Sequence, residues 1–331
     1  MSKVRWGIMS TANIGTELVI PAMQQGELCE IHAIASRNGE RASEVATELG
    51  IPVSYSSYDA LLTDVDVEAI YIPLPNHLHV EWAKRAIEAG KHVLCEKPLG
   101  LNAAEADDLR QFASQYPETK VMEAFMYRFH PQMDRVKKLL NDGAIGQIQT
   151  IHSEFSYYNT DPDNIRNIPE YGGGGLMDIG CYCISISRYL YEAEPRKVFG
   201  KMDIDPAMGT DFRTSGILEF DKGTATFTCG TQQAAFQHAN IIGTEGRIEV
   251  EMPFTPAGDK PARIWYHYDG QSDEILTEPK NHYTLQGDLF SGAILDDTPV
   301  PTPLDDALHN MIVIDGVVDS SKTGEWIPLE S

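Results

Sequence analysis

The chain has 331 residues, of which 42% are hydrophobic and 23% are charged, a composition typical of a globular protein with one or two domains. Its 49 acidic residues outnumber 26 basic residues, and the net charge of −23 excludes a nucleic-acid partner and disfavours binding to an anionic membrane. No stretch approaches ~18 consecutive apolar residues, and the N-terminus leads almost directly into a strand. We therefore expect no membrane span, no secretion signal and a cytoplasmic location.

The first part of the chain alternates strands with helices. Strands are predicted over residues 4–9, 30–35, 51–55, 67–72, 92–95 and 121–126. Helices are predicted over residues 14–25, 41–49 and 79–89, with another opening at the Asn102–Glu105 capping box. Pro21 should kink or shorten the first helix. This alternation predicts a doubly wound parallel sheet, an α/β fold with helices on both faces.

After a helix over residues 131–140 the pattern changes to strands separated by turns. The strands are predicted over residues 147–158, 197–203, 215–220, 224–231, 247–252 and 262–267. Few helices intervene, apart from residues 181–191 and 285–294. The second part should therefore be an α/β domain built on a large, mostly antiparallel open sheet. We expect a domain over 1–125 and another over 126–331, with the C-terminal segment free to return to the first domain.

Cysteine usage gives no sign of a disulfide framework or a metal centre. The five cysteines are an odd, scattered set in a chain without a signal sequence, which predicts reduced thiols. Cys181 and Cys183 are too close together for the usual zinc spacing, and no neighbouring pair completes a site. We therefore expect no metal.

The first strand–helix turn is a candidate cofactor-binding loop. Aligned on the glycine-rich pattern G-x-G-x-x-G, its three key positions are Ser10, Ala12 and Gly15. Small residues still let the backbone approach a pyrophosphate at the helix N-terminus. The predicted contacts are Ser10, Thr11, Ala12, Asn13 and Ile14. An ordinary turn between strand and helix fits the same residues.

The end of the second strand predicts which cofactor binds. An NAD site usually places Asp or Glu there to hold the ribose 2′-hydroxyl. This chain has Ser36 and Arg37 instead, and a hydroxyl followed by a guanidinium suits a 2′-phosphate. We therefore predict NADP rather than NAD, with a solvated loop arginine as the alternative explanation of Arg37.

The segment Glu96-Lys97-Pro98 ends the fifth strand, at the edge where open α/β sheets bind their ligands. A lysine ammonium there can lower the pKa of a nearby hydroxyl or polarise a carbonyl. The fourth strand runs into a proline-rich loop whose Pro73, Asn76 and His79 could line the nicotinamide side of the cofactor site. For His79, a packing or helix-capping role fits equally well.

A second cluster follows four consecutive glycines at positions 172–175. Such a run can pass close to another backbone or to a ligand. The helix after it should carry Asp178 and Tyr182 on one face, because they are four residues apart. A carboxylate and a phenol aimed together make a plausible proton-transfer pair. A buried tyrosine bonded to an aspartate for stability is the alternative.

Taken together, these motifs resemble the Gfo/Idh/MocA family of oxidoreductases, and the match spans essentially the whole chain. The motifs that carry it are RWGIMSTANIG from Arg5, EKP from Glu96, EAFMYRFHP from Glu123 and GGLMDIGCY from Gly174. The resemblance implies a Rossmann domain, an open-sheet domain whose exposed face mediates homo-oligomerisation, and Lys97 as the active-site lysine. Many members have histidine where this chain has Tyr182. The tyrosine instead resembles the branch with NADP-dependent D-xylose dehydrogenase, dimeric dihydrodiol dehydrogenase and glucose–fructose oxidoreductase.

The resemblance also implies roles for individual residues. Tyr182 would transfer the proton with help from Lys97, while Asp178 orients substrate or cofactor. Glu96 and Lys97 are further cofactor-side candidates, and Arg128 and His130 are cofactor- or substrate-side candidates. The substrate pocket would include Lys97, Asp178 and Tyr182, and its further candidates, for each of which a core or interface role fits equally well, are Phe155, Tyr157, Asn164, Arg166 and Tyr283.

Three functions are consistent with these residues. The leading hypothesis is an NADP-dependent dehydrogenase acting on a sugar, with an aldose oxidised at C1, or on a cyclic polyol. The alternative enzymes are a trans-dihydrodiol dehydrogenase and a deoxysugar ketoreductase. A non-catalytic, NADP-sensing regulator is the alternative of a different class, and the presence of both Lys97 and Tyr182 disfavours it.

Overall fold

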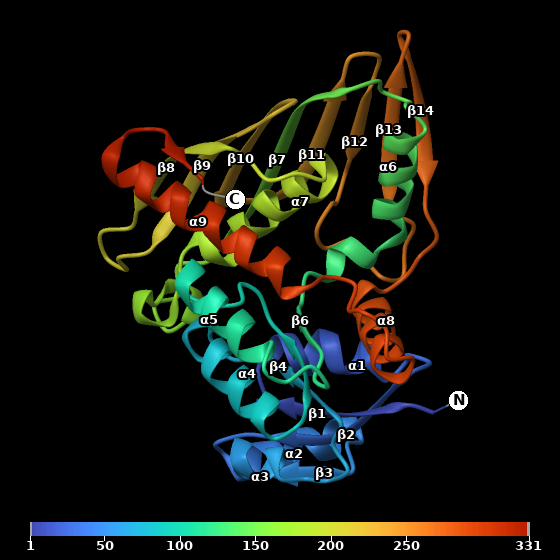
Figure 1. Ribbon diagram of the computed structural model, residues 1–331, viewed down its shortest axis with the longest axis vertical. Helices are drawn as coiled ribbons and strands as arrows, with labels where there is room; N and C mark the ends of the chain where they lie inside the picture. Colours follow the sequence, from blue (N-terminus) through green and yellow to red (C-terminus); the bar gives the residue numbers. More distant parts are fainter. Residues whose placement is uncertain (1, 330–331) are drawn as a thin grey trace. The chain divides into compact units, whose positions relative to one another are not determined.

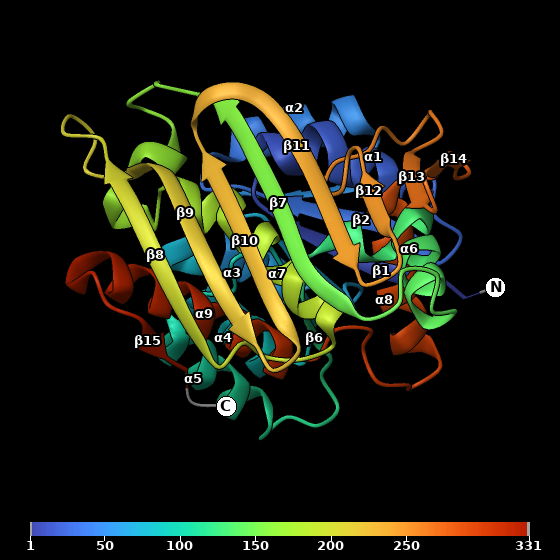
Figure 2. The same ribbon diagram turned by 90° about the horizontal axis from the view of Figure 1, so that it is seen from above.

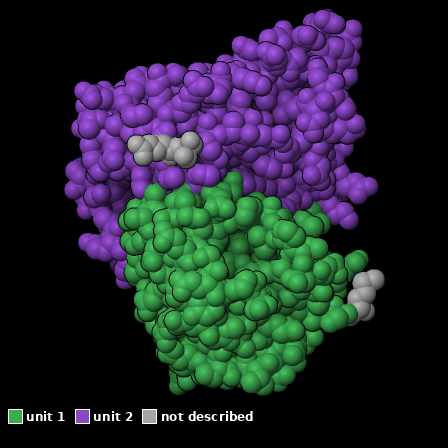
Figure 3. Space-filling model, viewed as in Figure 1, with its two compact units in different colours: residues 1–126, 281–308 green, residues 127–280, 309–331 purple. Residues whose placement is uncertain are grey.

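The computed structural model describes residues 2–329, which form two compact units (Figure 3). Unit 1 comprises Met1–Met126 and Asn281–Leu308, and unit 2 comprises Tyr127–Lys280 and His309–Ser331. The chain therefore passes between the units three times. The sequence placed everything after residue 125 in one domain with a returning C-terminal segment. In the structure the returning segment is Asn281–Leu308, and the residues after it belong to unit 2.

Unit 1 is built on a six-stranded parallel sheet (Figure 1). Its strands are β1 (Val4–Met9), β2 (Cys29–Ala35), β3 (Val53–Tyr55), β4 (Ala69–Ile72), β5 (His92–Cys95) and β6 (Val121–Glu123). They are ordered β3-β2-β1-β4-β5-β6, the doubly wound arrangement of dinucleotide-binding domains. The strands β1, β4 and β5 are almost completely buried, which explains their nearly continuous apolar sequences.

Most helices of unit 1 begin at a residue whose side chain caps them. They are α1 (Ile20–Met23), α2 (Gly39–Leu49), α3 (Tyr58–Leu62), α4 (His79–Glu88), α5 (Ala103–Ala113) and α8 (His282–Leu295), with a 3₁₀ turn η2 (Asn76–Leu78). The side chains of Asn38, Ser57 and Asn102 each accept a backbone N–H three residues further along the chain. The helix expected over residues 14–25 is a π-helix, η1 (Ile14–Val19), followed by α1, where Pro21 occupies the first turn.

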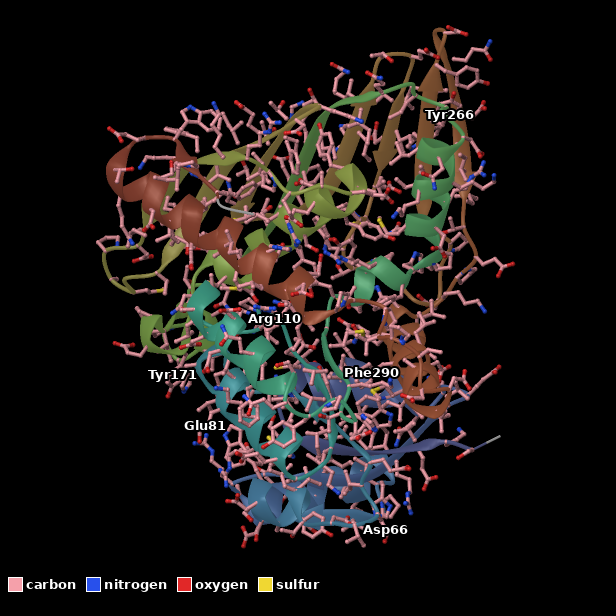
Figure 4. All side chains as sticks on the ribbon, in the orientation of Figure 1. Asp66, Glu81, Arg110, Tyr171, Tyr266 and Phe290 are labelled. Atoms are coloured by element: carbon pink, nitrogen blue, oxygen red, sulfur yellow. The ribbon has the colours of Figure 1, made fainter. Side chains whose placement is uncertain are left out.

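Helix α8 joins unit 1 although it lies far along the chain. Its Phe290, labelled in Figure 4, contacts the ring of Trp6 at a centroid distance of 5.7 Å. The Trp6 indole N–H donates to the hydroxyl of Ser291 at 3.1 Å. The Asp288 carboxylate accepts the backbone N–H of Leu28 at 2.8 Å. This apolar and polar packing ties α8 to the sheet of the first unit.

Unit 2 is built on a nine-stranded, mostly antiparallel sheet, which confirms the predicted fold class. Its order is β14-β13-β12-β11-β7-β10-β9-β8-β15, and only β7 and β10 are paired in parallel. The strands are β7 (Ile148–Tyr158), β8 (Lys197–Ile204), β9 (Asp211–Phe220), β10 (Gly223–Gly230), β11 (Gln232–Gly243), β12 (Arg247–Val250), β13 (Arg263–Tyr268), β14 (Gln271–Leu276) and β15 (Ile327–Pro328).

The helices of unit 2 gather on one face of this sheet. They are α6 (Pro131–Asn141), α7 (Cys181–Tyr191) and α9 (Leu304–Thr323), with the π-helix η6 (Leu176–Gly180) and the 3₁₀ turns η3 (Met126–Phe129), η4 (Ile165–Asn167) and η5 (Pro169–Tyr171). Helix α9 begins in unit 1 and continues into unit 2. Figure 2 shows β8, β9, β10, β7 and β11 side by side in front of α7, with their other face bare.

Candidate functional site

Ser10 forms a strained turn at the carboxyl end of β1. Its φ of 137° lies in a region that residues other than glycine rarely adopt. The hydroxyl donates to the Pro73 carbonyl at 3.2 Å and accepts the N–H of Ala12 at 3.0 Å. Ser10 thus takes the backbone shape of the missing glycine and uses its side chain to fix the turn against the loop after β4.

The residues after Ser10 lead into the N-terminus of η1. Thr11, Ala12 and Ile14 are half-buried, and Asn13 is exposed at the N-cap position. The N–H groups of a first helical turn point away from the helix and carry partial positive charge. This turn could hold the pyrophosphate of a dinucleotide.

The loop after β2 fits a phosphate better than a ribose hydroxyl. Ser36 is buried, and its hydroxyl accepts the Asn38 N–H at 3.1 Å. Arg37 is exposed, and its guanidinium lies within hydrogen-bonding reach of the Tyr58 hydroxyl, whose pKa is raised by burial and lowered by Arg37. The segment at the strand end contains no carboxylate before Glu40. These residues would attract a 2′-phosphate rather than repel it.

The Glu96-Lys97-Pro98 segment leaves β5 beside the loop after β4. The Tyr71 hydroxyl donates to Glu96 Oε1 at 2.6 Å, and the Glu96 N–H donates to the Ile72 carbonyl at 3.1 Å. The Lys97–Pro98 peptide bond is cis, and Lys97 is half-buried. Unit 1 therefore gathers Ser10, Pro73 and Lys97 at the carboxyl ends of β1, β4 and β5, where parallel sheets bind ligands.

His79 is completely buried and connects two of these loops. Its Nδ1 lies 2.8 Å from the Pro98 carbonyl and its Nε2 lies 2.7 Å from the Leu74 carbonyl. Burial lowers the pKa of His79 to about 4 although both carbonyls raise it, and Lys97 and His77 lower it further. The neutral ring donates to one carbonyl, and only the imidazolium can donate to both. This burial favours the packing role that the sequence left open for His79 over contact with a cofactor.

In unit 2, Asp178 lies in η6 and receives two hydrogen bonds. The Tyr157 hydroxyl donates to its Oδ2 at 2.6 Å, and the Arg166 Nε donates to its Oδ1 at 3.1 Å. The Asn164 side chain accepts the Arg166 N–H at 3.1 Å and so fixes the 3₁₀ turn that presents Arg166. Burial, followed by the Asp178 charge, raises the pKa of Tyr157 far above its usual value. Tyr157 therefore remains a protonated phenol that donates to Asp178.

Tyr182 lies in the first turn of α7, inside an aromatic cluster. Its ring centroid is 5.8 Å from that of Tyr127, 5.7 Å from Phe155 and 5.5 Å from Phe254. The Phe155 ring stacks on Phe254 at 5.2 Å. The structure thus brings five predicted residues of unit 2 into two groups of contacts: Phe155 and Tyr182 in the aromatic cluster, and Tyr157 and Arg166 on Asp178. Tyr127 was noted only as part of the EAFMYRFHP motif, and Phe254 was not singled out, because a single aromatic residue carries no sequence signal of function.

Of the other predicted residues, Arg128 contacts the aromatic cluster through the Tyr127 hydroxyl. The Arg128 guanidinium is buried and donates to the Ser185 hydroxyl of α7 at 2.7 Å. His130 is buried at the N-cap of α6, where its Nδ1 accepts the Gln132 N–H at 3.2 Å. Tyr283 lies on α8 of unit 1, and burial, followed by the Glu96 charge, raises the pKa of its phenol. Asn76 is half-buried and opens η2.

One group of possible metal ligands lies in unit 1, formed by His32, Asp64 and Asp66. Arg5 pairs with Asp66 at 2.7 Å, and the Tyr55 hydroxyl donates to Asp64 at 3.0 Å. Asp66, labelled in Figure 4, is exposed. These carboxylates already bind protein groups, so we assign the cluster a structural role. Among residues 2–329, no helix combines the length and apolar character needed to cross a membrane.

Comparison with protein families identifies both parts of the chain. Residues 4–125 match the model described as an oxidoreductase family with an NAD-binding Rossmann fold, and residues 133–249 match the GFO/IDH/MocA C-terminal domain. The chain belongs to the Gfo/Idh/MocA oxidoreductase family. The predicted family, the Rossmann domain and the assignment as an enzyme are thereby confirmed.

Relatives of known name cover almost the whole chain. An oxidoreductase from Rhizobium meliloti is 42% identical over 98% of this chain and 99% of its own. A D-xylose 1-dehydrogenase (NADP(+)) from Haloferax volcanii is 38% identical over 98% of this chain and 99% of its own. The crystal structure of a 3-ketoreductase from Actinomadura kijaniata with NADP and TDP-benzene has a TM-score of 0.91 and 29% identity, covering 96% of this chain and 98% of that one.

Proposed function

We propose that this Gfo/Idh/MocA protein is an NADP-dependent dehydrogenase that oxidises a sugar, an aldose at C1, or a cyclic polyol. The observation that carries the proposal is that two phenols in unit 2, those of Tyr157 and Tyr182, have different surroundings. Tyr157 donates to Asp178 at 2.6 Å and has a raised pKa, so it is unsuited to accept a proton. Tyr182, one helical turn after Asp178 in the sequence, packs its ring against Phe155, Tyr127 and Phe254, and the Tyr127 hydroxyl is bonded to Ser185.

Tyr182 acts as the acid and base of the reaction. During oxidation it takes the proton of the substrate hydroxyl, and during reduction it returns a proton to the same oxygen. A free tyrosine has a pKa near ~10, and Lys97, the active-site lysine that the family resemblance implies, is the proposed partner whose charge would favour the phenolate. Bound NADP supplies the hydride acceptor for oxidation and, once reduced, the hydride donor for reduction. Asp178, fixed by Tyr157 and Arg166, orients the substrate hydroxyls.

The loop after β2 supports NADP as the cofactor. Ser36 and Arg37 would hold the 2′-phosphate, and the turn from Ser10 to Ile14 would hold the pyrophosphate. The D-xylose dehydrogenase relative is named for NADP, and the ketoreductase structure contains it. Pro73, Asn76, Glu96 and Arg128 remain proposed cofactor-side residues, and Tyr283 a proposed substrate-side residue.

Turnover with a substrate panel tests the proposal. The full chain is incubated with NADP and aldoses, cyclic polyols or trans-dihydrodiols, and the absorbance of the reduced cofactor is followed. We expect turnover with at least one aldose or cyclic polyol, and a smaller kcat/KM when NAD replaces NADP. Turnover with dihydrodiols alone would contradict the sugar assignment.

A ketoreductase working in the opposite direction is the second candidate, because the 3-ketoreductase structure covers 96% of this chain. It predicts oxidation of reduced NADP by a keto-sugar and little reaction with aldoses. A non-catalytic regulator predicts tight NADP binding, measured by calorimetry, without turnover of any substrate in either direction. The same panel, run in both directions, separates these functions.

We also propose that the protein is a homo-oligomer, a dimer or tetramer, assembled through the bare face of the unit 2 sheet. That face exposes apolar side chains, with 51% of Phe236 and 36% of Ile217 accessible. Light scattering after gel filtration should show a dimer or tetramer, and Phe236→Asp should dissociate it. A monomeric wild type at micromolar concentration would contradict the assembly.

The five cysteines are buried free thiols, which supports a reducing cytoplasmic location.

A further inference from the structure

Asp211, the first residue of β9, is a carboxylate buried beneath the start of η6. Its Oδ2 accepts the backbone N–H of Leu176 at 2.8 Å and the hydroxyl of Thr214 at 2.6 Å. The residue is only 4% exposed. A buried carboxylate is costly unless its oxygens are hydrogen-bonded. Burial raises the pKa of Asp211, whereas the bonds from Thr214 and from the Leu176 backbone lower it.

The glycine loop passes directly against this carboxylate. Gly174 has a φ of +122°, and a Cβ at this position would overlap Asp211 Oδ1. The Gly174 N–H donates to the Arg166 carbonyl at 2.8 Å, while its own carbonyl accepts the Asp178 N–H at 3.0 Å. One residue of the loop is therefore fixed between Asp211, Arg166 and Asp178. A side chain at Gly174 would break this arrangement.

The helix that starts here is unusual in its first turn. Residues Leu176–Gly180 form a π-helix, which continues into the α-helix Cys181–Tyr191. A π-helical turn contains an extra residue compared with an α-helical turn, so it changes the direction in which Asp178 points relative to Tyr182. Isolated π-turns are rare and are frequently found at functional sites. The bond from the Leu176 N–H to Asp211 gives this turn a fixed point at its N-terminus.

We propose that Asp211 is a positioning residue, which fixes the start of the π-helix and thereby sets the directions of Asp178 and Tyr182. Its negative charge at the N-terminus of η6 also complements the partial positive charge of the helix end. The inference rests on the proposed function, in which Tyr182 moves the proton. Asp211 itself touches neither substrate nor cofactor in this role.

Kinetics of three variants in the full chain test the proposal. Asp211→Ala removes both bonds and should lower kcat by ~100-fold, since small misplacements of catalytic groups have effects of that order. Asp211→Asn keeps an acceptor oxygen and Thr214→Val keeps the bond to Leu176, so both should lose less. Calorimetry should show unchanged NADP affinity in all three, because the predicted cofactor loops lie in unit 1. Leu218→Ala, a buried change on the same strand, is the stability control and should keep the wild-type kcat.

Hydrogen exchange of residues 172–182 provides a readout that needs no turnover. In Asp211→Ala these amides should exchange faster than in the wild type, while in Leu218→Ala they should not. A folded Asp211→Ala enzyme with kcat within twofold of the wild type would overturn the positioning role while leaving the proposed function intact. If Asp211→Ala fails to fold, wild-type kcat in both Asp211→Asn and Thr214→Val would overturn it instead. If Asp211→Ala shows faster exchange but the wild type turns over no substrate, the proposed function would be overturned, while the positioning role of Asp211 would stand.

Discussion

In unit 1 most candidate residues lie on or near loops at the carboxyl ends of parallel strands, one of which leads into the π-helix η1, whereas in unit 2 Asp178 and Tyr182 lie on a helix whose first turn is the π-helix η6. The loops of unit 1 are joined mainly through backbone carbonyls, such as those of Pro73, Leu74 and Pro98. The π-helix of unit 2 is held by side chains, with Asp211 at its start and Tyr157 and Arg166 on Asp178. A parallel sheet brings its loops together by topology, whereas the start of η6 is held by an individual side chain, Asp211.

The largest expected effect tests whether one residue from each unit serves the same step. Tyr182→Phe should lower kcat by about 10²–10⁴-fold, the usual contribution of a general acid or base, while leaving NADP affinity unchanged. Lys97→Met should lower kcat in the same direction. If the two residues act together, the double variant should lose little more than the worse single variant, whereas additive losses would indicate separate roles.

Tyr157→Phe is the matched control for the tyrosine, because it removes a phenol from the same network. It breaks one hydrogen bond to Asp178 but leaves the proposed proton carrier intact. Its kcat should therefore fall much less than that of Tyr182→Phe. Equal losses in both variants, or normal turnover by Tyr182→Phe, would contradict the assignment of the proton step to Tyr182.

The loss of unfolding free energy in acid allows a comparison between one buried histidine of each unit. Burial lowers the pKa of both His79 and His130 to about 4, below the usual 6.5. Above pH 6.5 both are neutral whether folded or not, and between pH 6.5 and 4 the unfolded chain binds the protons. The folded state should therefore lose up to about 3 kcal/mol per histidine as the pH falls through this window.

Urea unfolding at several values between pH 7 and pH 4.5 measures this loss. His79→Gln removes the titrating ring from unit 1, and His130→Asn removes it from unit 2 while keeping a good N-cap residue. Each variant should show a shallower dependence of the unfolding free energy on pH than the wild type. A variant whose slope equals that of the wild type would show that its histidine does not titrate with folding.

Cofactor choice should depend on unit 1 alone. Arg37→Ala removes a charge-assisted hydrogen bond to the 2′-phosphate, so KM for NADP should rise by about 10- to 100-fold, with little change for NAD. Arg41→Ala is the control, because that exposed arginine pairs with Glu44 on α2. Initial-rate kinetics with both cofactors measure the effect. An equal rise in KM for NADP and NAD would show that Arg37 does not recognise the 2′-phosphate.

The two units also differ in how many of their strands and helices could be predicted from the sequence. All six strands of unit 1 were predicted, and the almost completely buried β1, β4 and β5 give nearly continuous apolar runs. In unit 2 the central strand β11 was missed, since its mixture of Gln, Ala, His and Asn lacks a strict alternation. Helix α9 was missed too, because its run of β-branched residues around Val313 resembles a strand.

The same contrast applies to the candidate site. Lys97 and Ser10 could be located from strand ends, since topology alone brings such positions together. Asp211 could not, because its partner Leu176 is 35 residues away and its contact depends on how β9 lies against the glycine loop. The π-helix was equally hidden, since one extra residue in a turn leaves the apolar periodicity almost unchanged.

The smallest expected effect concerns the strained turn that replaces a glycine in unit 1. At Ser10, with a φ of 137°, glycine would relieve strain while losing two hydrogen bonds, whereas alanine would lose the bonds and keep the strain. Ser10→Gly should therefore be more stable than Ser10→Ala by about 1–2 kcal/mol in urea unfolding. At Ser114, whose φ is −62°, the order should reverse, because alanine is favoured over glycine in helical backbone. If alanine were the more stable residue at both sites, the backbone at Ser10 would not be strained, and Ser10 would not be a substitute for the glycine of the usual cofactor-binding turn.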